Sequence, residues 1–428
     1  MGAGTRTGRV AAVVGVLLVS ALVASACGST SSAPPTTAPH GLPAFYAVPA
    51  GVSSKAPGTL LKYEKTTVSD IDATAYRVMY VSTGLDGKNV AVTGMVFVPP
   101  TAAPASGRDV VSWAHGTNGM ADSCAPSTDF VNEDLTTVPH ASVNALLAKG
   151  WVVTASDYQG EGTPPGLLPY LVGGISADNT IDIVLAAHQL AVADTSKQYA
   201  VWGHSEGGQT AMFAWDTAAT YGARDGFSQV GTVAGAPPTE FAAIYAYLET
   251  SPYRFYLLMA TVGYNTAYGN TAVPQDQILT PLGMSLIPTL QEGCFSYLEK
   301  TLDKYTYAQI FKENPTQLAG FAPTLTANDP IKLSSVPQVP LLIVLGGDDR
   351  DLLVVTTQAL YSQLCSLGAD VHRWIYPGYK HYEVMAVYTA DMVAWIANRF
   401  AGGAAGASPA PVGVADVQTQ SCGTSAPR

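Results

Sequence analysis

The stretch that decides the fold is Tyr199-Ala200-Val201-Trp202-Gly203-His204-Ser205-Glu206-Gly207. Its first four residues are apolar or aromatic and predict a buried strand, and the residues from Gly207 to Thr220 predict a helix. A Gly-x-Ser-x-Gly pattern at such a junction is typical of a nucleophile held on a sharp, strained turn. The helix that follows would point backbone N–H groups at developing negative charge. The stretch therefore predicts Ser205 as a nucleophile rather than as a serine that merely caps a helix.

Short apolar runs alternate with helix-like stretches on both sides of this junction. Runs that are apolar throughout fit strands buried on both faces, and the alternation predicts a mostly parallel, doubly wound α/β sheet. Two earlier runs, 75–81 and 90–99, flank a Gly-Leu-Asp-Gly turn and predict an antiparallel hairpin at the sheet edge. The further strands are expected at 110–114, 151–155, 340–345 and 371–376, and the further helices at 141–149, 176–193, 356–367 and 382–400.

The alternation fails between about residues 238 and 330. This segment holds 14 of the 39 aromatic residues of the chain, and we predict that it is a mainly helical insertion. The core of the domain would then comprise residues 43–237 and 331–400. Residues 401–428 form a low-complexity tail, which we expect Cys422 to tie back to the core through a disulfide.

Residues 1–27 predict an export signal. Two arginines precede an apolar run from Val10 to Ala24, which is shorter than the roughly 20 residues that span a bilayer. Ala-Ser-Ala before Cys27 is similar to a lipoprotein processing site, so we expect Cys27 to be lipidated; plain cleavage after Ala26 is the alternative. The uncharged Ser/Thr/Pro-rich residues 28–42 predict an extended tether. We therefore expect a protein that is secreted or held on the outer surface of a bacterial cell envelope, with possible membrane attachment through Cys27.

Charge and cysteine content exclude several classes of protein. The formal net charge is −11 and there is no run of Lys or Arg, so we expect no nucleic-acid partner. The five cysteines include no Cys-x-x-Cys pair, which argues against a cysteine-rich metal module. We expect no metal, no organic cofactor and a monomer. In an exported chain Cys124, Cys294, Cys365 and Cys422 predict two disulfides, and their spacing leaves all three pairings open.

A serine hydroxyl needs a base to become a strong nucleophile, and His381 is the best candidate among the seven histidines. It lies in the loop 377–381, between the last predicted strand of the core and its last helix. This architecture places its base in such a loop at the carboxyl end of a late strand. His115, which follows the strand at 110–114, is the competitor for this role.

The third member of a triad should be an acid in the loop after the preceding strand. Residues 346–351 supply three acids, of which we predict Asp349, with Asp351 as the alternative. The order Ser, Asp, His along the chain is that of hydrolases built on such a sheet. The carboxylate would hold the imidazole in the right tautomer and stabilise its cation.

Two backbone N–H groups should bind the oxyanion of the reaction. One is expected from Glu206, the residue after the nucleophile, and the other from the loop after the strand at 110–114. In that loop Gly116 permits a close approach, and we predict Thr117 as the donor.

These motifs together resemble the secretory lipase family of the α/β-hydrolases, which includes fungal lipase A-type enzymes and exported actinobacterial proteins. The resemblance extends from about residue 55 to residue 422. Its matching stretches are His115-Gly116-Thr117, Cys124-Ala125-Pro126-Ser127, Asp157-Tyr158-Gln159-Gly160-Glu161-Gly162, Gly203–Gly207, Gly346–Asp351 and His381.

The resemblance implies an α/β-hydrolase fold with residues 238–330 as a lid and acyl-binding region. It also implies one disulfide between Cys124 and Cys294 and a second between Cys365 and Cys422. The triad carried over from it is Ser205, Asp349 and His381, and the expected substrate-binding residues are His115, Gly116 and Tyr158.

The chain departs from the family pattern in two places. Residues 351–353 read Asp-Leu-Leu, where relatives commonly have a run ending in proline. Glu206 places a carboxyl group beside the nucleophile, where relatives often carry a neutral residue. A negative charge there would oppose an oxyanion unless the side chain points outward.

The sequence therefore predicts a serine carboxylic-ester hydrolase, a lipase or esterase that acts on acylglycerols or other apolar acyl esters through an acyl-enzyme. An acyltransferase or a peptidase on the same scaffold is an alternative, because the triad serves all acyl transfer. A non-catalytic lipid-binding surface lipoprotein is an alternative of another class.

Overall fold

The computed structural model describes residues 1–2, 41–130, 133–164, 166–403 and 409–422. The predicted export signal, Cys27 and nearly all of the predicted tether lie outside these ranges. Within them, no helix combines the length and the apolar character that a membrane crossing requires.

The core of the structure is one ten-stranded sheet with the strand order β1-β2-β3-β5-β4-β6-β7-β8-β9-β10. The five pairings from β5 through β9 are parallel, whereas β1, β2 and β3 at one edge and β10 at the other pair antiparallel. The strands are β1 (Leu60–Thr66), β2 (Thr74–Thr83), β3 (Asn89–Val98), β4 (Arg108–Ala114), β5 (Val152–Ser156), β6 (Thr195–His204), β7 (Ser228–Gly235), β8 (Leu341–Gly346), β9 (Val371–Tyr376) and β10 (Gln418–Cys422).

Helices cover both faces of this sheet. Successive strand residues point to opposite faces, so that Val110 packs into the core cluster under α2, α3 and α11, while Val111 packs into the cluster under α1 and α12. Both valines are fully buried, which explains why the central strands read as unbroken apolar runs. The flanking helices are α1 (Glu133–Leu147), α2 (Gly173–His188), α3 (Glu206–Asp216), α11 (Val354–Ser366) and α12 (Glu383–Phe400).

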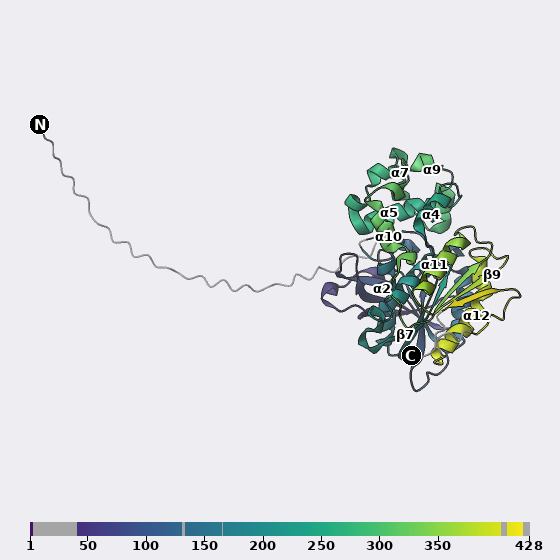
Figure 1. Ribbon diagram of the computed structural model, residues 1–428. Helices are drawn as coiled ribbons and strands as arrows, with labels where there is room; N and C mark the ends of the chain where they lie inside the picture. The colour runs from purple at the N-terminus through teal and green to yellow at the C-terminus, as the bar shows by residue number, and fades with distance from the viewer. Residues whose placement is uncertain (3–40, 131–132, 165, 404–408, 423–428) are drawn as a thin grey trace.

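A helical insertion joins β7 to β8 and stands over one end of the sheet, where α4, α5, α7 and α9 gather (Figure 1). The Asp329 carboxylate fastens its two ends together: it accepts hydrogen bonds from the Thr239 hydroxyl (3.0 Å) and from the N–H groups of Glu240 (2.9 Å) and Phe241 (2.8 Å). The insertion contains α4 (Phe241–Leu248), α5 (Phe255–Ala272), α6 (Gln275–Ile278), α7 (Pro281–Leu286), α8 (Phe295–Leu302), α9 (Tyr307–Ile310) and α10 (Phe321–Asn328). The 3₁₀ turns of the chain are Ala44–Tyr46, Val52–Ser54, Asp122–Cys124, Tyr221–Gly226, Ile287–Gln291, Pro315–Gln317 and Pro330–Lys332.

The predicted fold class, a mostly parallel doubly wound sheet with a mainly helical insertion, is confirmed. The predicted hairpin is also present, because β2 pairs with β3 in a continuous antiparallel register. Three strands escape the sequence pattern. The polar edge strands β1 and β10 lack an apolar run, and β7 is rich in glycine and small residues that have low strand propensity. Part of the predicted low-complexity tail thus completes the sheet as β10.

Both disulfides that the resemblance implies are present in the structure. Cys124 is bonded to Cys294 at the start of α8, and Cys365 of α11 is bonded to Cys422 of β10. The first bond joins the insertion to the segment after β4, and the second holds the tail against the core.

Candidate active site

Ser205 stands at the turn between β6 and α3, with a positive φ of 61° and a ψ of −123°. A non-glycine residue in this region is strained, and such strain is typical of a nucleophile that must project into a cleft. The glycines on either side are required by close packing. A Cβ on Gly203 would lie 2.1 Å from the Gly207 carbonyl oxygen, and one on Gly207 would lie 2.0 Å from that of Ala114. The Gly-x-Ser-x-Gly pattern therefore reflects how tightly β6, α3 and β4 meet.

His381 lies in the loop after β9, and its Nδ1–H donates a hydrogen bond of 2.7 Å to Asp349 Oδ2 in the loop after β8. The other carboxylate oxygen, Oδ1, accepts from the backbone N–H groups of Asp351 and Leu352, both at 3.0 Å. Since β8 and β9 are parallel neighbours, their carboxyl ends bring these two loops together. Asp349, and not Asp351, is the acid that orients the imidazole.

The Asp349–His381 pair is buried, and each partner stabilises the charged form of the other. Burial alone would raise the pKa of Asp349, but the charge and hydrogen bond of His381 hold this pKa below its ordinary value. Burial would likewise lower the pKa of His381, yet the Asp349 carboxylate raises it above 6.5. His204 packs against the His381 ring, with ring centroids 4.8 Å apart, and burial lowers the pKa of His204 to about 3. This low pKa makes His204 a much weaker base than His381.

Ser205 and His381 line the same cavity beneath the insertion. Because Nδ1 of His381 is engaged by Asp349, its Nε2 is the nitrogen available to a partner in this cavity. The insertion supplies an apolar wall from α4 and α5, and Glu206, Pro238, Tyr170, Leu171, Asp351 and Leu352 complete the lining. The wall residues are Phe241, Ile244, Tyr245, Leu248, Tyr256, Leu257 and Ala260.

The loop after β4 lies directly against the Ser205 turn. A Cβ on Gly116 would stand 3.1 Å from the His204 carbonyl oxygen and 3.7 Å from Ser205 Cβ, so the glycine permits this approach. Thr117 follows it, is nearly buried, and has its hydroxyl 2.8 Å from the hydroxyl of Tyr170. Sequence reasoning missed Tyr170, because it lies in a loop with no recognisable pattern.

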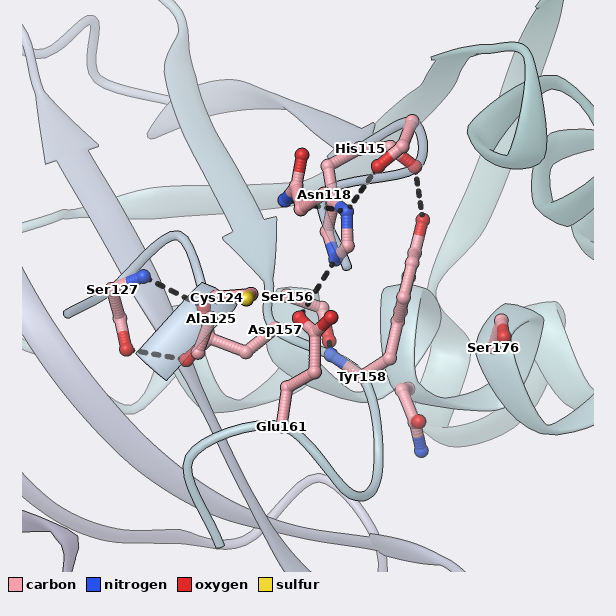
Figure 2. Close-up of polar contacts among 12 residues, drawn as sticks. His115, Asn118, Cys124, Ala125, Ser127, Ser156, Asp157, Tyr158, Glu161 and Ser176 are labelled. Carbon is pink, nitrogen blue, oxygen red and sulfur yellow. Dashed lines mark hydrogen bonds and ion pairs between the residues drawn. The ribbon is translucent and has the colours of Figure 1, made fainter. Parts of the chain in front are cut away.

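His115 and Tyr158, two of the expected substrate-binding residues, are buried below this loop and are absent from the described lining of the cavity (Figure 2). Their rings stack with centroids 4.1 Å apart, and the Tyr158 hydroxyl donates to the His115 carbonyl oxygen at 3.0 Å. His115 Nδ1 lies 2.8 Å from the Gly116 carbonyl oxygen. This placement indicates that His115 and Tyr158 support the loop that carries Thr117 and do not contact a substrate directly.

A buried polar cluster continues below His115 (Figure 2). Glu161 Oε2 lies 3.6 Å from His115 Nε2, yet burial lowers the pKa of His115 to about 4 and raises that of Glu161 well above its ordinary value. His115 is therefore neutral near pH 7, and burial favours the neutral form of Glu161 as well. Further along the same loop, Asp157 accepts hydrogen bonds from the N–H and the hydroxyl of Ser127. The motifs quoted from the sequence thus meet in space as one support for the loop after β4.

Glu206 is the first residue of α3, is almost fully buried, and lines the cavity beside Ser205. Burial raises the pKa of its carboxyl group to about 8. The side chain does not point outward to solvent, which was the arrangement that would have kept a negative charge away from the site.

The structure shows no group of three or more His, Cys, Asp or Glu side chains suited to a metal ion within the described ranges. The chemistry available in the cavity from its own side chains is that of a serine, an imidazole and a carboxylate.

Comparison with known proteins places this geometry among lipases. A family model described as secretory lipase matches residues 130–408. A secreted triacylglycerol lipase (LIP7) of Malassezia globosa is 24% identical over 381 residues, covering 84% of this chain and 79% of the relative. A Mycobacterium tuberculosis protein whose name is "Probable inactive lipase" is also 24% identical, over 373 residues, covering 84% of this chain and 82% of the relative.

Solved structures show the same fold. Candida antarctica lipase A in its closed state superposes with a TM-score of 0.74 at 19% identity, covering 90% of this chain and 88% of that one. The rice cell wall degrading esterase LipA from Xanthomonas oryzae superposes with a TM-score of 0.62 at 20% identity, covering 78% and 95% of the two chains. The fold is therefore that of the α/β-hydrolases.

Proposed function

The chain belongs to the secretory lipase family, and we propose that it is a secreted serine hydrolase that cleaves carboxylic esters with apolar acyl groups, such as acylglycerols. The observation that carries the proposal is the 2.7 Å bond between His381 and Asp349, made at a cavity that Ser205 also lines. The apolar wall from α4 and α5 supports an acyl chain over a charged peptide as the bound group.

The proposed reaction proceeds through an acyl-enzyme. Ser205 Oγ attacks the ester carbonyl carbon while His381 Nε2 takes the hydroxyl proton, and Asp349 stabilises the resulting imidazolium. The backbone N–H groups of Thr117 and Glu206 hold the oxyanion. The intermediate then collapses, and His381 returns the proton to the departing alcohol. Water repeats the sequence on the acyl-enzyme, which releases the carboxylic acid and restores the Ser205 hydroxyl.

Ser205→Ala tests the nucleophile. We expect turnover of a p-nitrophenyl ester to fall by about 10⁴-fold or more, since the remaining groups cannot form the acyl-enzyme. Labelling by a serine-reactive phosphonate should be lost as well. Ser142→Ala is the matched control, because Ser142 is a buried serine that bonds to Thr389, outside the cavity lining. The control variant should keep both ester turnover and phosphonate labelling, and circular dichroism should show the same fold for both variants.

A wild-type protein that neither turns over esters nor reacts with the phosphonate would favour a non-catalytic lipid-binding protein. Transfer of the acyl group to an added alcohol faster than to water, or cleavage of aminoacyl amides in preference to esters, would favour an acyltransferase or a peptidase on this scaffold.

We also propose that residues 1–27 direct export and that the mature chain starts at a lipidated Cys27. The relatives named as secreted support export, and the small residues before Cys27 support lipidation. Mass spectrometry of the mature N-terminus from a bacterial host that processes lipoproteins tests this. A diacylglyceryl group on Cys27 is the expected result, and an unmodified Cys27 or a start elsewhere would show a free secreted protein.

A further inference from the structure

The side chain of Glu206 is a buried carboxyl group that is poorly supplied with hydrogen bonds. It is 2% exposed, and it lines the cavity with Ser205 and His381. Neither of its oxygens accepts a hydrogen bond of good geometry among the described residues, although the Thr117 hydroxyl lies close enough to lower its pKa. That hydroxyl is also within hydrogen-bond distance of the Tyr170 hydroxyl. An ionised carboxylate in such a place would lose its hydration and gain little in return.

Apart from His381, the groups that face Glu206 from the neighbouring elements are acids and phenols. The segment between β5 and α2 contributes Tyr158, Glu161 and Tyr170, each of which interacts electrostatically with Glu206. Asp351 and His381 line the same cavity from the late loops, and Tyr245 and Tyr256 line it from the insertion. Among the described residues that line the cavity there is no Lys or Arg. The described lining therefore supplies no permanent positive charge to compensate an ionised Glu206.

These surroundings keep a proton on the carboxyl group at neutral pH. Burial raises the pKa of Glu206 to about 8, and the nearby Thr117 hydroxyl offsets this rise only in part. Burial, and then the charge on Glu206, raises the pKa of Glu161 well above its ordinary value, so the two carboxyl groups oppose each other's ionisation.

We propose that Glu206 is a positioning residue whose side chain must be a neutral carboxylic acid during turnover, and that its ionisation stops ester hydrolysis on the alkaline side. The inference rests on the proposed function, in which the N–H of this same residue binds the oxyanion. When the carboxyl group releases its proton to solvent, the new negative charge lies within one side-chain length of that oxyanion. Because Glu206 is buried, such like-charge repulsion is weakly screened and weakens the transition state.

Glu206→Gln distinguishes this role from a purely structural one, because glutamine has the same shape and cannot ionise. The measurement is kcat/KM for a p-nitrophenyl ester, read at the isosbestic point of p-nitrophenol and corrected for spontaneous hydrolysis, from about pH 6 to about pH 9.5. Above about pH 8 we expect the wild-type value to fall tenfold per pH unit, so that the value at pH 9.5 is about thirtyfold below that at pH 7. In E206Q the ratio of kcat/KM at pH 9.5 to kcat/KM at pH 7 should rise to nearly one.

Asp178→Asn is the matched control. Burial also raises the pKa of Asp178, to about 7, but this residue lies on α2 and is not part of the described cavity lining. Asp178→Asn removes a carboxyl group that titrates in a similar pH range, and the fall of kcat/KM at alkaline pH should remain as in the wild type.

The inference is overturned if E206Q keeps the wild-type ratio, or if the wild-type protein shows no alkaline fall up to pH 9.5. Glu206→Met gives a second uncharged variant of similar length, which should also abolish the fall if E206Q does not fold. Failure of the proposed function looks different, because the wild-type protein would then show neither turnover nor phosphonate labelling at any pH.

Discussion

Two carboxyl groups flank Ser205, and their surroundings are opposite. On the side formed by the loops after β8 and β9, which we call the late side, both oxygens of Asp349 accept hydrogen bonds. Oδ2 accepts from His381, and Oδ1 accepts from two backbone N–H groups. The early side is formed by the loop after β4 and the start of α3. On the early side, neither oxygen of Glu206 accepts a hydrogen bond of good geometry among the described residues. The pKa of Asp349 is therefore held below its ordinary value by His381 despite burial, whereas burial raises that of Glu206 to about 8, a rise that Thr117 offsets only in part. Two buried carboxyl groups thus become a charge or a neutral acid according to the partners supplied.

Asp349→Asn should disrupt the late side of the cavity and lower kcat more than a change at Asp351 or at either disulfide. An amide cannot stabilise the imidazolium, and its N–H₂ can force the wrong tautomer on His381, so we expect kcat to fall by about 10³- to 10⁴-fold. The residual activity should persist to lower pH. The wild-type carboxylate raises the pKa of His381, so its removal lowers the pH at which the base becomes protonated.

Asp351→Asn is the control for Asp349, because it removes the neighbouring acid from the same loop. Asp351 lines the cavity, but the carboxylate that bonds to His381 is that of Asp349, to which the Asp351 backbone N–H donates. We expect a change of no more than a few-fold in kcat. Equal losses in the two variants, measured with the same ester, would show that both acids serve the histidine.

Sequence alone predicted the late side well, for a physical reason. Two local patterns lie next to each other in the sequence. One is a strand followed by a loop with acids, and the other is a strand followed by a loop with a histidine. The parallel pairing of β8 with β9 brings the ends of these two strands together. Sequence left Asp351 open as the alternative to the predicted Asp349, because two residues of a loop differ in direction and not in composition; in the structure Asp349 bonds to His381.

The early side was less accessible to sequence reasoning. His115 and Tyr158 looked like substrate contacts, but the structure uses them below the loop, where their rings stack and Glu161 adjoins them. Whether a side chain faces a cavity or lies behind its wall depends on packing among distant segments. The neutral state of Glu206 could not be predicted for the same reason, because it depends on the burial and the hydrogen bonds that the fold gives this side chain.

The insertion and the sheet edges show a similar limit. Aromatic content and lost alternation predicted a helical segment, yet its division into seven α-helices in the described structure depends on contacts across the domain. The edge strand β10 forms from polar residues because β9 offers an unpaired edge and the Cys365–Cys422 bond holds the tail beside it.

The two disulfides differ in their distance from the cavity, and removing them one at a time gives the smallest expected effect on activity. Cys124–Cys294 sits beside the loop after β4, where the Phe295 N–H donates to the Asn118 carbonyl oxygen at 2.7 Å. Cys365–Cys422 joins α11 to β10, away from the described cavity lining. Both close long loops, so each double serine variant should lose about 2–5 kcal/mol of unfolding free energy in denaturant titrations.

Activity should separate the two variants. Without the Cys124–Cys294 bond, the insertion can pull away from the loop that carries Thr117, so the oxyanion donor is placed less accurately and kcat/KM should fall about tenfold. The variant that lacks Cys365–Cys422 should stay within about twofold of the wild type at a temperature where both remain folded. Equal activities in the two variants would mean that the hydrogen bond between Phe295 and Asn118 holds the early side without covalent help, and that the disulfide serves stability alone.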